Sequence, residues 1–172
     1  MRASNVLRAA LILGTVLPTF AQGQTKDAPT PSQILAAKKV FISNVGADAE
    51  VITTFKRMGQ SRMPYERFYS EMKNWGRYEL VSSPADADLV FEIRFLAPIS
   101  DCTGSFTTYT PQYTLSIVDV KTHFTLWTLA ERVQGAYRKA TLEKNLTDGM
   151  ASLMADLKQL SAQPAASVAA KE

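Results

Sequence analysis

The chain has 172 residues, of which 46% are hydrophobic and 20% charged, with 19 basic and 16 acidic residues. Two of the basic residues, Arg2 and Arg8, lie in a segment that we expect to be removed, which leaves 17 basic residues against 16 acidic ones. This near balance lacks the basic excess typical of nucleic-acid binding, so we expect no nucleic-acid partner. The single cysteine, Cys102, excludes an intramolecular disulfide and multi-cysteine zinc sites.

Residues 1–21 have the layout of a Sec-type signal peptide. A short basic start is followed by the apolar run 9–17, and Thr19 and Ala21 are the small residues that a signal peptidase reads. The apolar run is far shorter than the roughly 20 residues that a membrane-spanning helix needs. We therefore predict cleavage after Ala21, a periplasmic location and no transmembrane segment in the processed chain.

The processed chain divides into three parts by composition. Residues 22–35 are mostly polar with two prolines, which indicates a flexible leader. Residues 36–160 carry the apolar periodicity of a single domain. Residues 161–172 are low in large apolar side chains, which predicts a disordered tail.

Within 36–160, the apolar spacing separates strands from helices. One strand alternates cleanly, because Leu89, Phe91, Ile93 and Phe95 share one parity. The spacing predicts strands at 38–44, 78–82, 89–95, 113–117 and 124–133, and amphipathic helices at 64–75 and from about 141 to 160. Residues 47–63 stay unassigned. The fold class is therefore α/β (α+β), a two-layer sandwich in which one mostly antiparallel sheet of about five strands packs on two helices.

Four segments carry a resemblance, and they lie at 38–42, 75–81, 85–93 and 119–122, the last together with Leu126 and Trp127. Together they resemble a family of exported proteins of unknown function that is common in Acidobacteria. More distantly, the element order is similar to the amino-terminal domain of the Tol-system protein TolB and to envelope lipoproteins that regulate penicillin-binding proteins. The resemblance implies an envelope binding or assembly domain, not an enzyme. The chain lacks the lipidation cysteine of the lipoproteins.

Two short patterns could support chemistry. Ser70 and Lys73 match S-x-x-K, the nucleophile motif of penicillin-binding enzymes, but S-D-N is missing and this spacing is expected about once by chance. Asp86 and Asp88 could suggest a divalent metal, yet the glycine and final glutamate of a calcium loop are missing, so turn capping explains them better. We assign no catalytic residue.

The only histidine, His123, falls at a predicted hairpin tip, where an exposed structural role is favoured over catalysis. No group of histidine, cysteine and carboxylate residues has metal-ligand spacing, and no glycine-rich nucleotide motif occurs. We therefore expect neither a metal nor a cofactor.

The remaining feature is the long loop predicted at 97–111, which is rich in hydroxyl side chains. Asp101, Phe106 and Tyr109 could contact a peptide or a sugar, and long loops are often functional. The sequence thus favours a non-catalytic binding or assembly module of the cell envelope, with an envelope protein or glycan as partner. The alternative is a small periplasmic hydrolase acting on envelope polymers.

Overall fold

The computed structural model describes residues 29–47, 63–103, 106–136 and 138–162. The predicted signal peptide and residues 163–172 of the predicted tail lie outside these ranges. In chain order, the described elements are α1 (Ser32–Ala36), β1 (Lys39–Ala47), α3 (Met63–Trp75), β2 (Glu79–Leu80), the 3-10 turn η1 (Pro84–Asp86), β3 (Leu89–Leu96), β4 (Ile99–Thr103), β5 (Phe106–Tyr109), β6 (Gln112–Asp119), β7 (Thr125–Arg132) and α4 (Lys139–Ala162).

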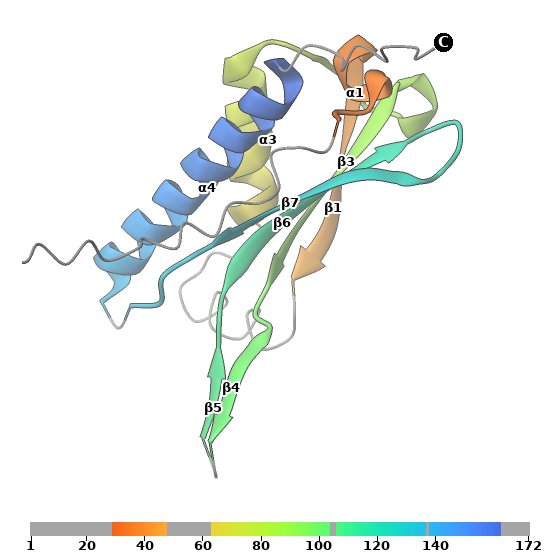
Figure 1. Cartoon of the computed structure of the whole chain (residues 1–172). Coiled ribbons are helices and arrows are strands. Elements are labelled where there is room, and N and C mark those ends of the chain that lie inside the picture. Colours follow the sequence, from red (N-terminus) through yellow and green to blue (C-terminus); the bar gives the residue numbers. More distant parts are fainter. Residues whose placement is uncertain (1–28, 48–62, 104–105, 137, 163–172) are drawn as a thin grey trace, which may run out of the picture.

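Five strands form the main sheet, in the order β2-β1-β3-β6-β7. Helices α3 and α4 pack on one face of this sheet and make the second layer (Figure 1). The predicted α+β sandwich with about five strands and two amphipathic helices is confirmed. One detail differs, because β1 runs parallel to both β2 and β3, whereas the pairs β3–β6 and β6–β7 are antiparallel. Parallel pairing follows from the crossover through α3, which returns the chain to the end of the sheet where β1 began.

The core lies between the sheet and the two helices. The predicted alternation of β3 is confirmed, since Leu89, Phe91, Ile93 and Phe95 are all at most 2% exposed. Strand β6 alternates in the same way, with buried residues at 113, 115, 117 and 119. Because side chains alternate between faces with a period of two, a one-residue slip would expose all of these groups, so burial fixes the register.

The predicted helix at 64–75 is confirmed as α3. Its residues Phe68 and Met72 are buried against the sheet. The helix ends at Gly76, which has a φ of 66° and whose N–H donates to the Met72 carbonyl at 3.2 Å. This left-handed cap suits glycine because it has no Cβ.

Helix α4 begins at Lys139, two residues before the start that the spacing predicts near residue 141, and it passes very close to the sheet at Gly149. A Cβ placed on Gly149 would lie 2.9 Å from Cγ2 of Val133 and 3.5 Å from Cε2 of Tyr113. This close approach to the sheet explains why a glycine stands within the helix.

Helix α1 is a difference from the sequence-based expectation, which assigned residues 22–35 to a flexible leader. Ile34, within α1, is completely buried in the core. The Leu35 carbonyl also accepts a hydrogen bond from Arg77 at 3.3 Å. A five-residue helix is too short to show an apolar period, so no periodicity marks it in the sequence.

Candidate functional site: a protruding β-hairpin arm

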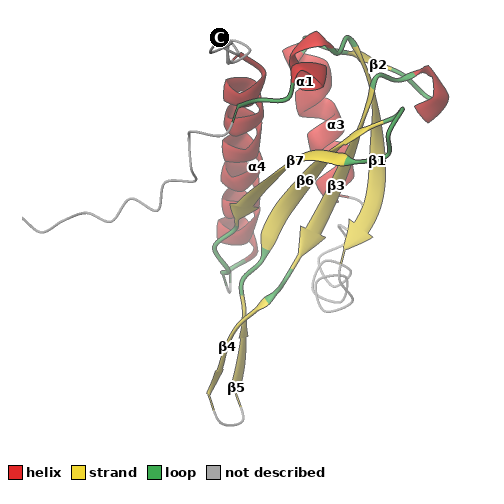
Figure 2. Cartoon of the chain, turned by 45° about the vertical axis from the view of Figure 1, so that its right-hand side comes forward, coloured by secondary structure: helices red, strands yellow, loops and turns green. Residues whose placement is uncertain are grey.

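The segment predicted as a loop at 97–111 is instead a two-stranded β-ribbon. Strands β4 and β5 pair antiparallel and continue the β3–β6 hairpin beyond the main sheet (Figures 1 and 2). Among the described elements, each of these strands packs extensively only against the other. We call β4, β5 and their connection, residues 99–109, the arm.

Two prolines stand where the arm leaves the sheet. Pro98 and Pro111 have no N–H, so they cannot donate to a neighbouring strand. The Pro111 carbonyl still accepts the Val133 N–H at 2.7 Å. Across the hairpin, the Thr110 N–H donates to the Pro98 carbonyl at 2.9 Å, which keeps the ribbon continuous. The prolines therefore mark the boundary between a five-stranded sheet and a two-stranded arm.

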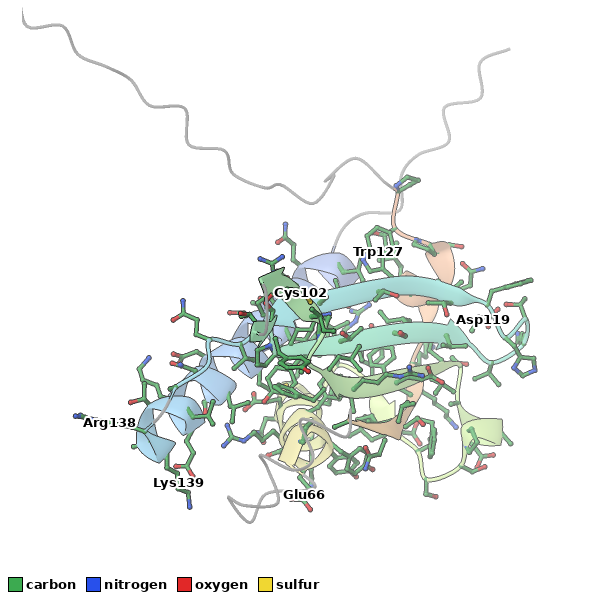
Figure 3. All side chains as sticks on the ribbon, turned by 90° about the horizontal axis from the view of Figure 1, so that it is seen from below. Glu66, Cys102, Asp119, Trp127, Arg138 and Lys139 are labelled. Carbon is green, nitrogen blue, oxygen red and sulfur yellow. The ribbon has the colours of Figure 1, made fainter. Side chains whose placement is uncertain are left out.

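The arm exposes apolar side chains at its base. Ile99 is 59% exposed and Tyr109 is 41% exposed, and the two residues are paired across the strands. Cys102, further along the arm, is also exposed (Figure 3). Near them, the Ser100 hydroxyl donates to the Thr108 carbonyl at 3.1 Å. The base of the arm thus offers a small apolar contact with hydrogen-bonding groups beside it.

The three residues proposed from the sequence all lie on the arm. Register places Asp101 opposite Thr108, and Phe106 opposite Thr103. The surroundings of the Asp101 and Phe106 side chains lie outside what the structure describes. Only the exposure of Tyr109 is therefore established for the predicted set, and the binding role of all three stays a prediction.

The S-x-x-K residues do not form a site with other candidates. Ser70 and Lys73 are both exposed on α3, on the side away from the core. Of the two aspartates, Asp86 is exposed in η1. Asp88 instead anchors the start of β1, since its carboxylate accepts the backbone N–H groups of Lys38 at 2.8 Å and Lys39 at 2.9 Å. These two hydrogen bonds hold the pKa of Asp88 below its ordinary value.

The turn between β6 and β7 holds the only histidine. His123 is exposed there, with a φ of 62°, and its N–H donates to the Asp119 carbonyl at 2.8 Å. The Asp119 carboxylate accepts the Thr122 hydroxyl at 2.8 Å and the Lys121 N–H at 3.2 Å. The Thr122 hydroxyl, followed by the Lys121 N–H, lowers the pKa of Asp119. This carboxylate therefore shapes the turn, at the end of β6 away from the arm (Figure 3).

Sequence reasoning missed a carboxyl pair between β7 and α4. Burial, followed by a hydrogen bond to Asp156 and the charge of Asp156, raises the pKa of Glu131 to about 7. Glu131 shares its parity with the buried residues Leu129 and Val133, and this was the available signal that its side chain faces the core. Asp156 is distant in sequence, so no local pattern could pair the two.

A second polar group in the core is the Tyr113 hydroxyl. Tyr113 is completely buried, and within the described residues its hydroxyl has no hydrogen-bond partner. Burial raises the pKa of this phenol to about 12, against a smaller opposing effect of the Arg67 charge. Arg67 itself donates to the Thr147 hydroxyl at 2.6 Å and so ties α3 to α4.

Across the described ranges, no three His, Cys, Asp or Glu side chains gather in a way that could hold a metal ion. None of the helices in these ranges combines the length and the apolarity that crossing a membrane requires.

Comparison with known proteins gives matches to solved structures only. No family profile matches the chain, and no curated protein does. A PelC dodecamer from Paraburkholderia phytofirmans is 13% identical, with a TM-score of 0.45 over 70% of this chain and 86% of that one. A DUF4136 family protein from Bacteroides thetaiotaomicron is 10% identical, with a TM-score of 0.47 over 80% of this chain and 94% of that one. An uncharacterised lipoprotein B from Nitrosomonas europaea is 12% identical, with a TM-score of 0.41 over 74% and 84%.

Bacterial lipoproteins are thus among the structures that this chain matches. The TM-scores of the three matches lie below 0.5, so they carry no argument about the function of this chain. The resemblance to the acidobacterial exported family and to TolB stays a prediction.

Proposed function

We propose that the chain is an exported, non-catalytic binding module of the cell envelope, and that the arm contacts its partner, an envelope protein or glycan. Export is supported by the basic and apolar pattern of residues 1–21. The observation that carries the binding role is the arm itself, which extends past the sheet with Ile99 and Tyr109 exposed side by side.

The low stability of an isolated ribbon favours contact between the arm and a partner. An isolated two-stranded ribbon is marginally stable in water, and the arm has no helix packed on it among the described elements. A partner that covers the apolar groups of such a ribbon would stabilise it. Tyrosine suits such a contact, because it presents a large rigid surface together with a hydroxyl, and it is enriched among residues that dominate binding energy.

A site-specific photocrosslinking experiment tests this role. A photoreactive amino acid replaces Tyr109 in one form of the full chain and Tyr69 in another, and both are expressed in cells with intact envelopes. Tyr69 is the matched control, because it is 40% exposed, close to the 41% of Tyr109, but lies on α3. We expect a defined adduct from position 109 that is absent from position 69.

A substitution then separates the arm from the rest of the surface. In the position-109 form, Ile99→Ser should weaken the adduct, whereas Tyr69→Ser should leave it intact. Equal adducts from both positions, or none from position 109, would show that the arm does not contact a partner.

A further inference from the structure

Strand β7 is the outermost strand of the main sheet, beside β6 and on the margin opposite β2 (Figure 2). It is eight residues long, from Thr125 to Arg132. Within the described residues, its backbone pairs with β6 alone, so the outward N–H and C=O groups have no backbone partner. An edge strand of this length is a template for pairing with another chain.

At the opposite margin of the sheet, the backbone groups at the start of β1 have hydrogen-bond partners. There, the first part of β1 is covered by β2, and the Val81 N–H donates to the Val40 carbonyl at 3.0 Å. The Asp88 carboxylate accepts hydrogen bonds from the N–H groups of Lys38 and Lys39. Among the described residues no strand covers β7, and between residues 127 and 132 it contains no proline, lysine or bulge. Of the features that protect natural sheet edges, this stretch has only the core-facing Glu131 near its end.

The side chains of β7 can pair favourably with those of a second copy of β7. On the face toward the core, Trp127 is half-buried and Leu129 is buried, and Figure 3 places Trp127 at the β7 margin of the sheet. On the other face, Thr128 is exposed. Two copies of β7 related by a two-fold axis must pair antiparallel, with each residue opposite one on the same face. A two-fold centred on Thr128 then sets threonine opposite threonine and, twice, Trp127 opposite Leu129.

We propose that a second copy of this chain docks on β7, pairing antiparallel about Thr128 to make one continuous ten-stranded sheet. Aromatic–aliphatic and threonine–threonine pairs are among the favourable cross-strand contacts. The Trp127–Leu129 pairs lie in the regular part of β7, because the irregularity of the β6–β7 ladder falls before Trp127. No like charges face each other, so the strand meets its copy without repulsion.

Neighbouring registers are less favourable. Shifting the axis to Leu129 sets Trp127 opposite Glu131, which places a carboxyl group against the indole. Shifting it to Trp127 sets Leu129 opposite Thr125, where the β6–β7 ladder is already irregular. Only the axis at Thr128 brings the two core-face apolar residues together on both sides.

The first test is the mass of the purified processed chain in solution, measured by sedimentation over a micromolar concentration series. We expect a monomer–dimer equilibrium. Thr128→Lys sets two like charges opposite each other at the axis and should weaken dimerisation by roughly tenfold or more. Ser43→Lys makes the same change on β1, away from the β7 margin, and should leave dimerisation unchanged. Circular dichroism checks that both variants are folded.

The second test fixes the register. In a Cys102→Ser background, Thr128→Cys places two thiols directly opposite each other, where an antiparallel pair has Cα atoms about 4.5–5.5 Å apart, close enough for a disulfide. We expect mild oxidation to crosslink this variant and not Ala130→Cys, whose position lies opposite residue 126 of the second copy. A chain that stays monomeric, a dimer unaffected by Thr128→Lys, or preferential crosslinking at position 130 would each overturn the proposal. Because the arm is not part of β7, none of these results bears on its contact with a partner.

Discussion

Three carboxylates show how the environment of a single residue decides its role. Asp88 and Asp119 accept backbone and hydroxyl hydrogen bonds, which favour the charged form and lower their pKa values. Glu131 faces the core beside another acid, and its pKa is raised to about 7. The first two carboxylates therefore support the fold at neutral pH, whereas the third opposes it once it is ionised.

The raised pKa of Glu131 predicts how the stability of the fold depends on pH. The folded-state pKa of Glu131 lies above its ordinary value of 4.5, so the folded state binds this proton more tightly than the unfolded state. The free energy of unfolding should therefore fall as the pH rises from about 4.5 through about 7. Glu131→Gln removes the ionisation, and we expect a higher melting temperature than that of the wild type at pH about 8, with little difference at pH about 5.

Melting curves at both pH values, followed by circular dichroism, provide the measurement. Glu71→Gln is the control, because Glu71 is exposed on α3. A Glu131→Gln variant whose melting temperature differs from the wild type by the same amount at both pH values would contradict the assignment.

At the scale of elements, the sequence predicts the strands and helices whose apolar residues recur with a regular period. The alternation at Leu89–Phe95 and the helical spacing of Phe68 and Met72 were sufficient, because each pattern spans several turns or several strand residues and reports one buried face. The arm was not predicted as strands. Its many threonines suit both loops and ribbons, and with no core beside it the arm shows no apolar alternation. A crossover from the first strand through the helix to the second was expected, and it agrees with the parallel pairing of β1 with β2. The parallel pairing of β1 with β3 was not predicted, because it depends on the path of the chain in space.

The packing of α4 against the sheet gives a prediction at the same scale. A side chain at position 149 would enter the space held by Val133 and Tyr113. Overfilling a packed core typically costs about 1–3 kcal/mol, so we expect Gly149→Leu to lower the free energy of unfolding by about 2–3 kcal/mol. Gly149→Ala adds one methyl group and gains helix propensity of up to about 1 kcal/mol, so its net effect should be much smaller.

Urea denaturation of a double-mutant cycle checks the cause. Val133→Ala removes the methyl group that a Cβ at position 149 would meet at 2.9 Å. The combination of Gly149→Ala with Val133→Ala should therefore be more stable than the sum of the two single effects predicts. Simple additivity would mean that the close approach at Val133 does not explain the glycine.

At the scale of the whole molecule, the fold separates the groups that stabilise it from those that we propose bind a partner. The buried cluster lies between the sheet and the helices and, among the residues whose burial the structure describes, includes none of β4 or β5. The exposed apolar pair Ile99 and Tyr109 lies on the arm, beyond both prolines. Removing the arm should therefore leave the core intact, and the melting temperature of a chain without the arm tests this.

The Thr110 N–H already donates to the Pro98 carbonyl at 2.9 Å, which is the hydrogen bond that closes a four-residue turn. Replacing residues 99–109 with Asn-Gly should close the hairpin at this point with a type I′ turn, whose twist matches that of the flanking strands. We expect this armless chain to fold with a melting temperature close to that of the wild type, because it keeps every residue of the core cluster. It should also show no partner contact in envelopes. A large loss of thermal stability would instead make the arm part of the folding unit, and the exposure of Ile99 and Tyr109 would then no longer argue for binding.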